Sequence, residues 1–197
     1  MQQINHEKVL ILGNGVSRKN YVKFIQEWEG EIWACNSAFL ELANGSLPRL
    51  DRLIGDYVAL KIAVKYKRKY RLKMAIYGKN KRSWELPGVQ QLTLPKHFYA
   101  ESGSTLVAAA LYEGYKEVKV LGFDLGGMDL YVQHHERKDK SKWIKNWRKI
   151  ANHFGLDRVE FIGKDHKPYI LSNLPEDLYA KHYLEGKNHL DISLENI

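Results

Sequence analysis

Residues 8–17 read KVLILGNGVS. Four apolar residues run into a turn with two glycines, which is the pattern of a buried parallel strand followed by a ligand-binding turn. Gly13 and Gly15 let the backbone approach a ligand closely. The amides at the start of the following helix would face an anion, and Ser17 adds a hydroxyl donor. We predict that Gly13, Asn14, Gly15 and Ser17 bind a nucleotide phosphate. The alternative is a plain turn in which Ser17 only caps the helix.

Strand and helix patterns alternate beyond this turn. Further strands are predicted at residues 31–35, 50–54, 117–121 and 158–162, and helices at residues 17–28, 104–112 and 141–154. This alternation predicts an α/β fold, with a Rossmann-like, mostly parallel sheet and flanking helices. Ligands of such sheets bind at the carboxyl ends of the strands. Residues 13–17, 36–37 and 122–124 are expected at those ends.

The composition fits one globular domain over residues 1–197, with 44% apolar and 27% charged residues. Residues 57–100 are basic and rich in tyrosine, and we predict that they form a lid or an insertion. No stretch approaches 18 consecutive apolar residues, so we expect no membrane span and a cytoplasmic location. The single cysteine, Cys35, leaves no intramolecular disulfide to form, and we expect it to be buried.

Two common nucleotide-binding motifs do not fit the turn. The dinucleotide fingerprint requires a third glycine and an acid at the end of the second strand. Arg18 stands at the third glycine position, and Asn36, not an acid, stands at the end of the second predicted strand. No Gly-Lys-Ser/Thr sequence follows the turn, so the P-loop is absent as well.

Several segments resemble one family. LGNGVS at residues 12–17 resembles the Gly-Asn-Gly-Pro-Ser turn of bacterial CMP-sialic-acid-dependent lipooligosaccharide sialyltransferases. ACNS at residues 34–37 is similar to their Arg-Cys-Asn segment. SG at 102–103, GYKEV at 114–118 and GFD at 122–124 resemble their Ser-Gly, Gly-Tyr-Lys-Glu-Ile and Gly-Ile-Asp block in the same order.

The resemblance implies a glycosyltransferase with a Rossmann-like nucleotide domain, a lid, and an inverting transfer. It implies that Asn14, Gly15, Asn36, Ser102 and Gly103 contact the nucleotide or the donor phosphate. It implies no Asp-x-Asp metal motif, so we predict no metal. The nucleotide sugar is a substrate, and no tightly bound cofactor is expected.

The loop after the strand at 117–121 holds the candidate catalytic residues. The resemblance matches Tyr131 to a tyrosine that holds the leaving phosphate, and His135, with His134 as the near alternative, to the base. A histidine suits this task because it titrates near neutral pH. Asp124 could orient the histidine, bind the donor sugar or cap the next turn. The other interpretation of the two histidines is a solvated polar loop.

Two further classes of function stay open. The archaeal-type 6-hydroxymethylpterin diphosphokinases share a Gly-x-Gly-Pro-Ser turn, a Ser-Gly helix start and a Gly-x-Asp-Leu strand end, which is similar to residues 122–125 here. That resemblance predicts an ATP-dependent phosphotransferase. The third class is a non-catalytic nucleic-acid-binding module.

The positive charge of the chain, +8 overall, is concentrated in two runs. Residues 61–82 hold ten basic and no acidic residues, and residues 137–149 hold seven basic residues and one acid. The first run contains Lys61, Lys65, Lys67, Arg68, Lys69, Arg71, Lys73, Lys79, Lys81 and Arg82, and the second Arg137, Lys138, Lys140, Lys142, Lys145, Arg148 and Lys149.

Tyrosines at 66, 70 and 77 and tryptophans at 143 and 147 accompany these charges. Cations with aromatic rings suit a nucleic-acid backbone with stacked bases. We therefore predict DNA as a partner, with a hydroxymethylated base of viral DNA as the acceptor. An anionic lipid-linked glycan is the competing acceptor. The alternative is that the lysines are simply solvated and that the tryptophans pack in the core.

Overall fold

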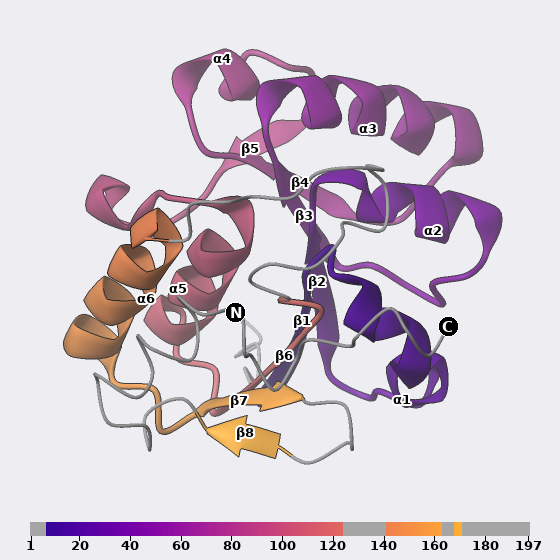
Figure 1. Ribbon diagram of the computed structural model, residues 1–197. Coiled ribbons are helices and arrows are strands. Elements are labelled where there is room, and N and C mark those ends of the chain that lie inside the picture. The colour runs from indigo at the N-terminus through magenta and orange to yellow at the C-terminus, as the bar shows by residue number, and fades with distance from the viewer. Residues whose placement is uncertain (1–6, 124–140, 163–167, 171–197) are drawn as a thin grey trace.

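The computed structural model describes residues 7–123, 141–162 and 168–170, and it describes side chains in the first two ranges except at residues 141–144. Its strands form one eight-stranded sheet in the order β5-β4-β3-β2-β1-β6-β7-β8 (Figure 1). The strands are β1 (Lys8–Leu12), β2 (Glu31–Cys35), β3 (Arg52–Gly55), β4 (Ala75–Gly78), β5 (Val89–Gln91), β6 (Glu117–Leu121), β7 (Val159–Ile162) and β8 (Pro168–Ile170).

The sheet is parallel from β5 through β7, and β8 pairs with β7 in the antiparallel direction. β1 lies between β2 and β6, so the chain builds the sheet outward from β1 first on one side and then on the other. The strand order therefore reverses between β1 and β6. Open parallel sheets bind ligands at such a switch point, outside the carboxyl ends of the strands.

Helices cover both faces of the sheet (Figure 1). The α-helices are α1 (Val22–Gln26), α2 (Phe39–Asn44), α3 (Tyr57–Tyr70), α4 (Lys81–Trp84), α5 (Ser102–Tyr112) and α6 (Ser141–Phe154), with 3-10 turns η1 (Val16–Tyr21), η2 (Asn36–Ala38) and η3 (Lys96–Phe98). α1, α2 and α3 lie on one face, and α5 and α6 lie on the other. None of the described helices is long and apolar enough to cross a membrane.

The buried strand β1 divides its side chains between two cores. Val9 and Ile11 join the core beneath α5 and α6, whereas Leu10 and Leu12 join the core beneath α1 to α3. All four are fully buried. A strand buried on both faces needs a continuous apolar run rather than an alternating one, which is why this segment was readable from the sequence.

The predicted fold class is confirmed. β6 and α6 have the predicted bounds, and residues 13–17 lie at the carboxyl edge of a central strand. The first helical segment differs, because η1 precedes a short α1 that ends at Gln26 instead of continuing to Trp28. Its N-cap is Gly15, with no side-chain hydrogen bond, so the alternative in which Ser17 caps the helix was wrong.

Residues 57–100 contain α3, β4, α4, β5 and η3. β4 and β5 extend the parallel sheet beyond β3. The suggestion that this region acts as a lid stays a prediction.

A charged network ties the amino edge of the sheet to the loop before β6. The hydroxyl of Tyr115 donates to Glu31 Oε1 at 2.7 Å, and Trp33 Nε1 donates to Glu31 Oε2 at 2.7 Å. Arg52 bonds Glu113 at 2.7 Å and lies over the Trp33 ring. Burial, followed by the hydrogen bond to the Glu31 carboxylate, raises the pKa of Tyr115 well above its usual value.

Candidate functional site

The candidate site lies where the carboxyl ends of β1, β2, β3, β4 and β6 meet the first turn of α5. The topology brings these ends to one edge of the sheet because all five strands run in the same direction. The residues that follow the strands are Asn14, Asn36, Asp56, Lys79 and Phe123. Each of these residues makes different contacts at this edge of the sheet.

The turn after β1 is held against the end of β6. Gly13 N donates to Leu121 O and Gly15 N donates to Gly122 O, each at 2.8 Å. A Cβ at Gly13 would lie 2.2 Å from Gly122 O, so the two backbones touch. Glycine at position 13 is thus required by the neighbouring strand end, and the amides of Gly13 and Gly15 donate to carbonyl oxygens at that end.

Phe123 fills the space between the β1 turn and the start of α5. A Cβ at Gly103 would lie 2.5 Å from the Phe123 ring, and a Cβ at Gly13 would lie 2.8 Å from the same ring. Gly103, which was predicted to contact the nucleotide, therefore has a packing role beside Phe123. The ring also packs edge-on against Trp147 of α6.

Arg18 explains the missing third glycine. Its side chain is 3% exposed, forms an ion pair with Glu41 of α2, and packs its methylene groups where Gly122 has no Cβ. Gly122 itself has a φ of 77°, a conformation that favours glycine. Because a buried arginine occupies this position, the turn differs from that of the dinucleotide fingerprint.

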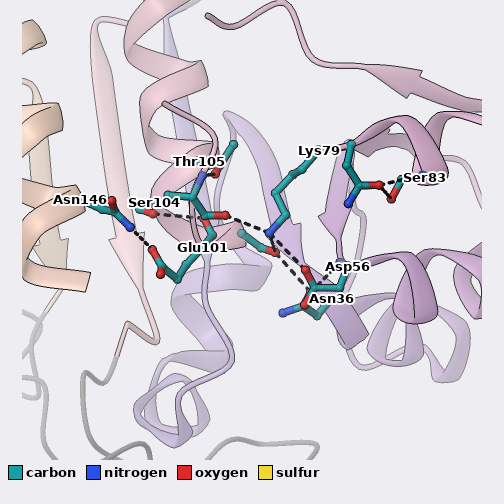
Figure 2. A network of polar contacts seen from close by, with 11 residues as sticks. Asn36, Asp56, Lys79, Ser83, Glu101, Ser104, Thr105 and Asn146 are labelled. Atoms are coloured by element: carbon teal, nitrogen blue, oxygen red, sulfur yellow. Dashed lines mark hydrogen bonds and ion pairs between the residues drawn. The ribbon is translucent and has the colours of Figure 1, made fainter. Parts of the chain in front are cut away.

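Asn36 is the centre of a polar network at the carboxyl edge (Figure 2). Its backbone is left-handed, with φ 52°, which asparagine tolerates better than most residues. Its Oδ1 atom accepts a hydrogen bond from Ser102 Oγ at 3.4 Å and another from the Asp56 amide at 3.4 Å. Asn36 and Ser102 come from distant parts of the chain, and both were predicted to contact the nucleotide.

Lys79 and Asp56 are members of the network that the sequence analysis missed. Lys79 Nζ donates to Ala100 O and to Ser102 Oγ, each at 3.0 Å, and pairs with Asp56 Oδ1 at 3.3 Å (Figure 2). The Lys79 side chain is 13% exposed, whereas that of Asp56 is 75% exposed. Lys79 was assigned to a surface charge run, and the structure corrects this assignment, since the ammonium lies beside Ser102.

The first turn of α5 is fixed by its own side chains. Ser104 Oγ donates to Glu101 O at 3.1 Å, and Thr105 Oγ1 accepts from the Ala100 amide at 3.0 Å. The carboxylate of Glu101 bonds Asn146 of α6 (Figure 2). The amides of residues 102–104 have no partner within the helix, so they add positive electrostatic potential next to Lys79.

The remaining predicted residues either are partly or fully buried in the described structure or lie outside it. Asn14 is half-buried, with its Oδ1 atom 3.7 Å from Cys35 Sγ, and Ser17 is 2% exposed. Cys35 is 5% exposed, as expected for a buried core residue. The four candidate catalytic residues, Asp124, Tyr131, His134 and His135, lie outside the described residues. The described part of the chain holds no cluster of three metal-ligating side chains.

Three of the aromatic rings near the basic runs pack against the protein, whereas Tyr70 is 45% exposed and the side chain of Trp143 lies outside the described residues. Tyr66 packs on Phe39, and Tyr77 packs against the core and below Arg52. Trp147 is 3% exposed and contacts Phe161 in the core. The prediction that Trp147 serves a nucleic-acid surface was wrong, because the ring packs in the core, whereas Tyr66 and Tyr77 are half-buried. The outward lysines of α3 remain exposed.

Three solved sialyltransferase structures from Campylobacter jejuni are similar to this chain. Monofunctional α-2,3-sialyltransferase Cst-I has a TM-score of 0.59 at 15% identity, covering 93% of this chain and 95% of that one. An α-2,3-sialyltransferase in apo form has 0.57 at 16%, covering 94% and 96%. CstII in complex with cytidine-5'-monophosphate has 0.51 at 17%, covering 79% of each chain. The likeness shows a sialyltransferase-like fold.

No protein-family profile matches the chain. No curated protein sequence matches it significantly. The comparisons give no support to the diphosphokinase resemblance.

Proposed function

We propose that this chain is a glycosyltransferase that moves a sugar from a nucleotide-activated donor to an acceptor hydroxyl. The donor binds at the carboxyl edge of the sheet, across the switch point between β1 and β6. One observation carries the proposal: Asn36 and Ser102, each assigned to the donor from sequence segments far apart, are hydrogen-bonded partners in one network. The sialyltransferase-like fold supports it.

Lys79 would stabilise the charge of the departing phosphate. Its ammonium lies beside Ser102 and the open amides of the α5 first turn, so several positive groups converge at one place. Transfer leaves negative charge on the nucleotide, and donors fixed in advance stabilise such charge most effectively. Asp56 balances Lys79 at 3.3 Å, and its exposed carboxylate can turn away when an anion binds.

The base that removes the proton of the acceptor hydroxyl is His135 in this proposal, with His134 as the alternative. Tyr131 would hold the leaving phosphate, and Asp124 would orient the histidine or bind the sugar. His135→Ala should lower turnover by about 10²–10⁴, while donor affinity changes by a few fold at most. If His134→Ala causes the loss instead, the neighbouring histidine is the base. Full activity in both variants excludes this loop as the source of the base.

A thermal-shift screen against CMP, UDP, GDP, ATP and their sugars tests the donor site. We expect one nucleotide sugar to raise the melting temperature, and Ser102→Ala and Lys79→Gln to remove most of that rise. Ser46→Ala, an exposed serine beyond α2, should leave it unchanged. A shift with ATP and Mg²⁺ alone favours the phosphotransferase alternative. No shift with any nucleotide, together with salt-sensitive DNA binding, favours the non-catalytic module.

The acceptor is a separate proposal. A hydroxymethylated base in viral DNA would require a base flipped out of the duplex and phosphate contacts around it. What supports DNA is the charge of α3, because Lys61, Lys65 and Lys69 are exposed on its outward side. A glycan or small-molecule acceptor would leave these lysines without a role in binding. A direct measurement of DNA affinity distinguishes a DNA acceptor from a glycan or small-molecule acceptor.

A further inference from the structure

A pocket lies at the opposite edge of the sheet from the candidate donor site. α3 starts just after the carboxyl end of β3 and ends before the first residue of β4, so its last turn reaches the amino edge. There it meets the segment before β5, and a pocket of about 460 Å³ opens between them. This volume lies in the range of small-molecule sites.

The walls of the pocket combine two chemistries. Its cationic side is formed by Lys67, Arg68 and Arg71 at the end of α3, and no acidic residue lines it. Its apolar side is formed by Val64, Leu72 and Ile76. Val64 and Ile76 are 8% and 1% exposed, so this side continues the core of the α1–α3 face.

Arg71 has an unusual backbone for its residue type. It ends α3 in the left-handed conformation, with φ 53° and ψ 39°, where glycine or asparagine is the usual choice. A long cation in this conformation costs about 1 kcal/mol or more relative to glycine. Within the described residues, neither Arg71 nor Arg68 forms an ion pair with an acid. Both arginine side chains are exposed, so their guanidinium groups are open to a ligand at the mouth of the pocket.

We propose that this pocket binds an amphiphilic phosphate ester, with the phosphate on Arg68, Arg71 and Lys67 and the apolar part on Val64, Leu72 and Ile76. Guanidinium groups suit a phosphate because their paired N–H groups match two oxygens. A bare anion would leave the apolar side of the pocket without a partner. An apolar substituent on the ligand binds there favourably, because its transfer from water to an apolar surface lowers the free energy. A nucleic-acid backbone offers phosphates without such a substituent. The ligand is either a soluble phosphorylated metabolite or a phospholipid headgroup with the start of its chains.

Calorimetry with dihexanoylphosphatidic acid below its micelle concentration tests the proposal. We expect saturable binding to the full chain, weakened about tenfold or more by Arg68→Gln and by Arg71→Gly. Glycine accepts the left-handed conformation, so Arg71→Gly should fold at least as well as the wild type. Lys23→Gln, an exposed lysine on α1, is the control and should bind normally.

Several outcomes would overturn the proposal. They are absence of binding to the wild type, unchanged binding by both arginine variants, and equal affinity for inorganic phosphate or for dihexanoylglycerol, which lacks the phosphate. Displacement of the probe by a DNA duplex would assign the pocket to nucleic acid and overturn it too. Sedimentation with vesicles that contain phosphatidic acid then distinguishes the two sources of the ligand: co-sedimentation lost in Arg71→Gly indicates a membrane lipid, and binding of the soluble probe alone indicates a metabolite. Nucleotide-induced thermal shifts should survive in Arg71→Gly, because the donor site lies at the other edge.

Discussion

Two glycines of the β1 turn face different neighbours and should respond differently to substitution. Gly13→Ala would place a methyl group 2.2 Å from Gly122 O, and backbone atoms cannot move away as a side chain does. We expect a loss of about 3 kcal/mol or more in the free energy of unfolding. Urea unfolding followed by circular dichroism measures it. A wild-type midpoint in this variant would show that the two strand ends are not packed as described.

Gly15 has an ordinary backbone, with φ −67° and ψ 147°, that a β-branched residue can adopt. Gly15→Val should therefore fold, yet its side chain would occupy space that the donor phosphate takes in the proposed complex. We expect nucleotide binding to be abolished in calorimetry while the urea midpoint stays near that of the wild type. Unchanged affinity would mean that the turn has only a structural role.

Two substitutions of Asn36 distinguish its effect on backbone strain from its effect on ligand binding. Asn36→Gly removes the left-handed strain and the amide together, so the free energy of unfolding should change by no more than about 1 kcal/mol. Asn36→Ala keeps an unfavourable φ and should be less stable than Asn36→Gly by about 1–2 kcal/mol. Donor affinity should fall about tenfold in both variants. If Asn36→Gly binds the donor normally, its amide only supports Ser102 and Asp56.

At the scale of elements, much of the fold was readable because most long elements carry a local signal. The apolar run at β1 and the glycine-ended helices α5 and α6 are examples. Among the elements that escaped prediction, α4 with four residues and η3 and β8 with three each are too short for a periodic pattern. Their existence depends on contacts with neighbouring strands.

The candidate site could be predicted from the sequence only in part, because only some of its residues stand in a segment with a local sequence signal. Asn36 and Ser102 stand in recognisable segments, whereas Lys79 is one lysine among ten basic residues. Its burial comes from the pairing of β3 with β4 and from the position of α5, which bring Asp56 and Ser102 to it. Such non-local contacts leave no trace in the sequence around residue 79.

The outward side of α3 tests the DNA proposal. Reversal of Lys61, Lys65 and Lys69 to glutamate should weaken duplex binding for all sequences alike. It should also flatten the salt dependence, in which log K falls with log salt by roughly 0.9 per phosphate contact. These residues lie outside the amino-edge pocket, and Lys67 is avoided because its ammonium donates to Met74 O. Fluorescence anisotropy at low salt provides the measurement, with Lys23→Glu as the control. Wild-type protein without DNA affinity would contradict the proposal.

At the scale of the whole molecule, the Glu31–Tyr115 pair links the amino edge of β2 to the loop before β6. The pKa of Tyr115 is raised in the folded state, so its contribution to stability is complete below the ordinary tyrosine pKa of about 10 and is lost as pH rises above it. Tyr115→Phe should lose about 1.5–3 kcal/mol at pH 8. The difference in the free energy of unfolding between the wild type and Tyr115→Phe should decrease by about 1.4 kcal/mol per pH unit above pH 10. Urea unfolding between pH 8 and 11 tests this, and a constant gap would argue against the hydrogen bond.

The contact between the β1 turn and the end of β6 also has a consequence for biosynthesis. Leu121 accepts from Gly13 across 108 residues of sequence, so the turn leaves the ribosome long before its partner. At roughly 5–20 residues per second, that delay is about 5–20 s. During this time the β1 turn lacks the strand end to which Gly13 and Gly15 donate their hydrogen bonds. If the proposed donor site includes this turn, a nucleotide sugar can stabilise only chains translated past β6, which makes the donor a ligand of late folding intermediates.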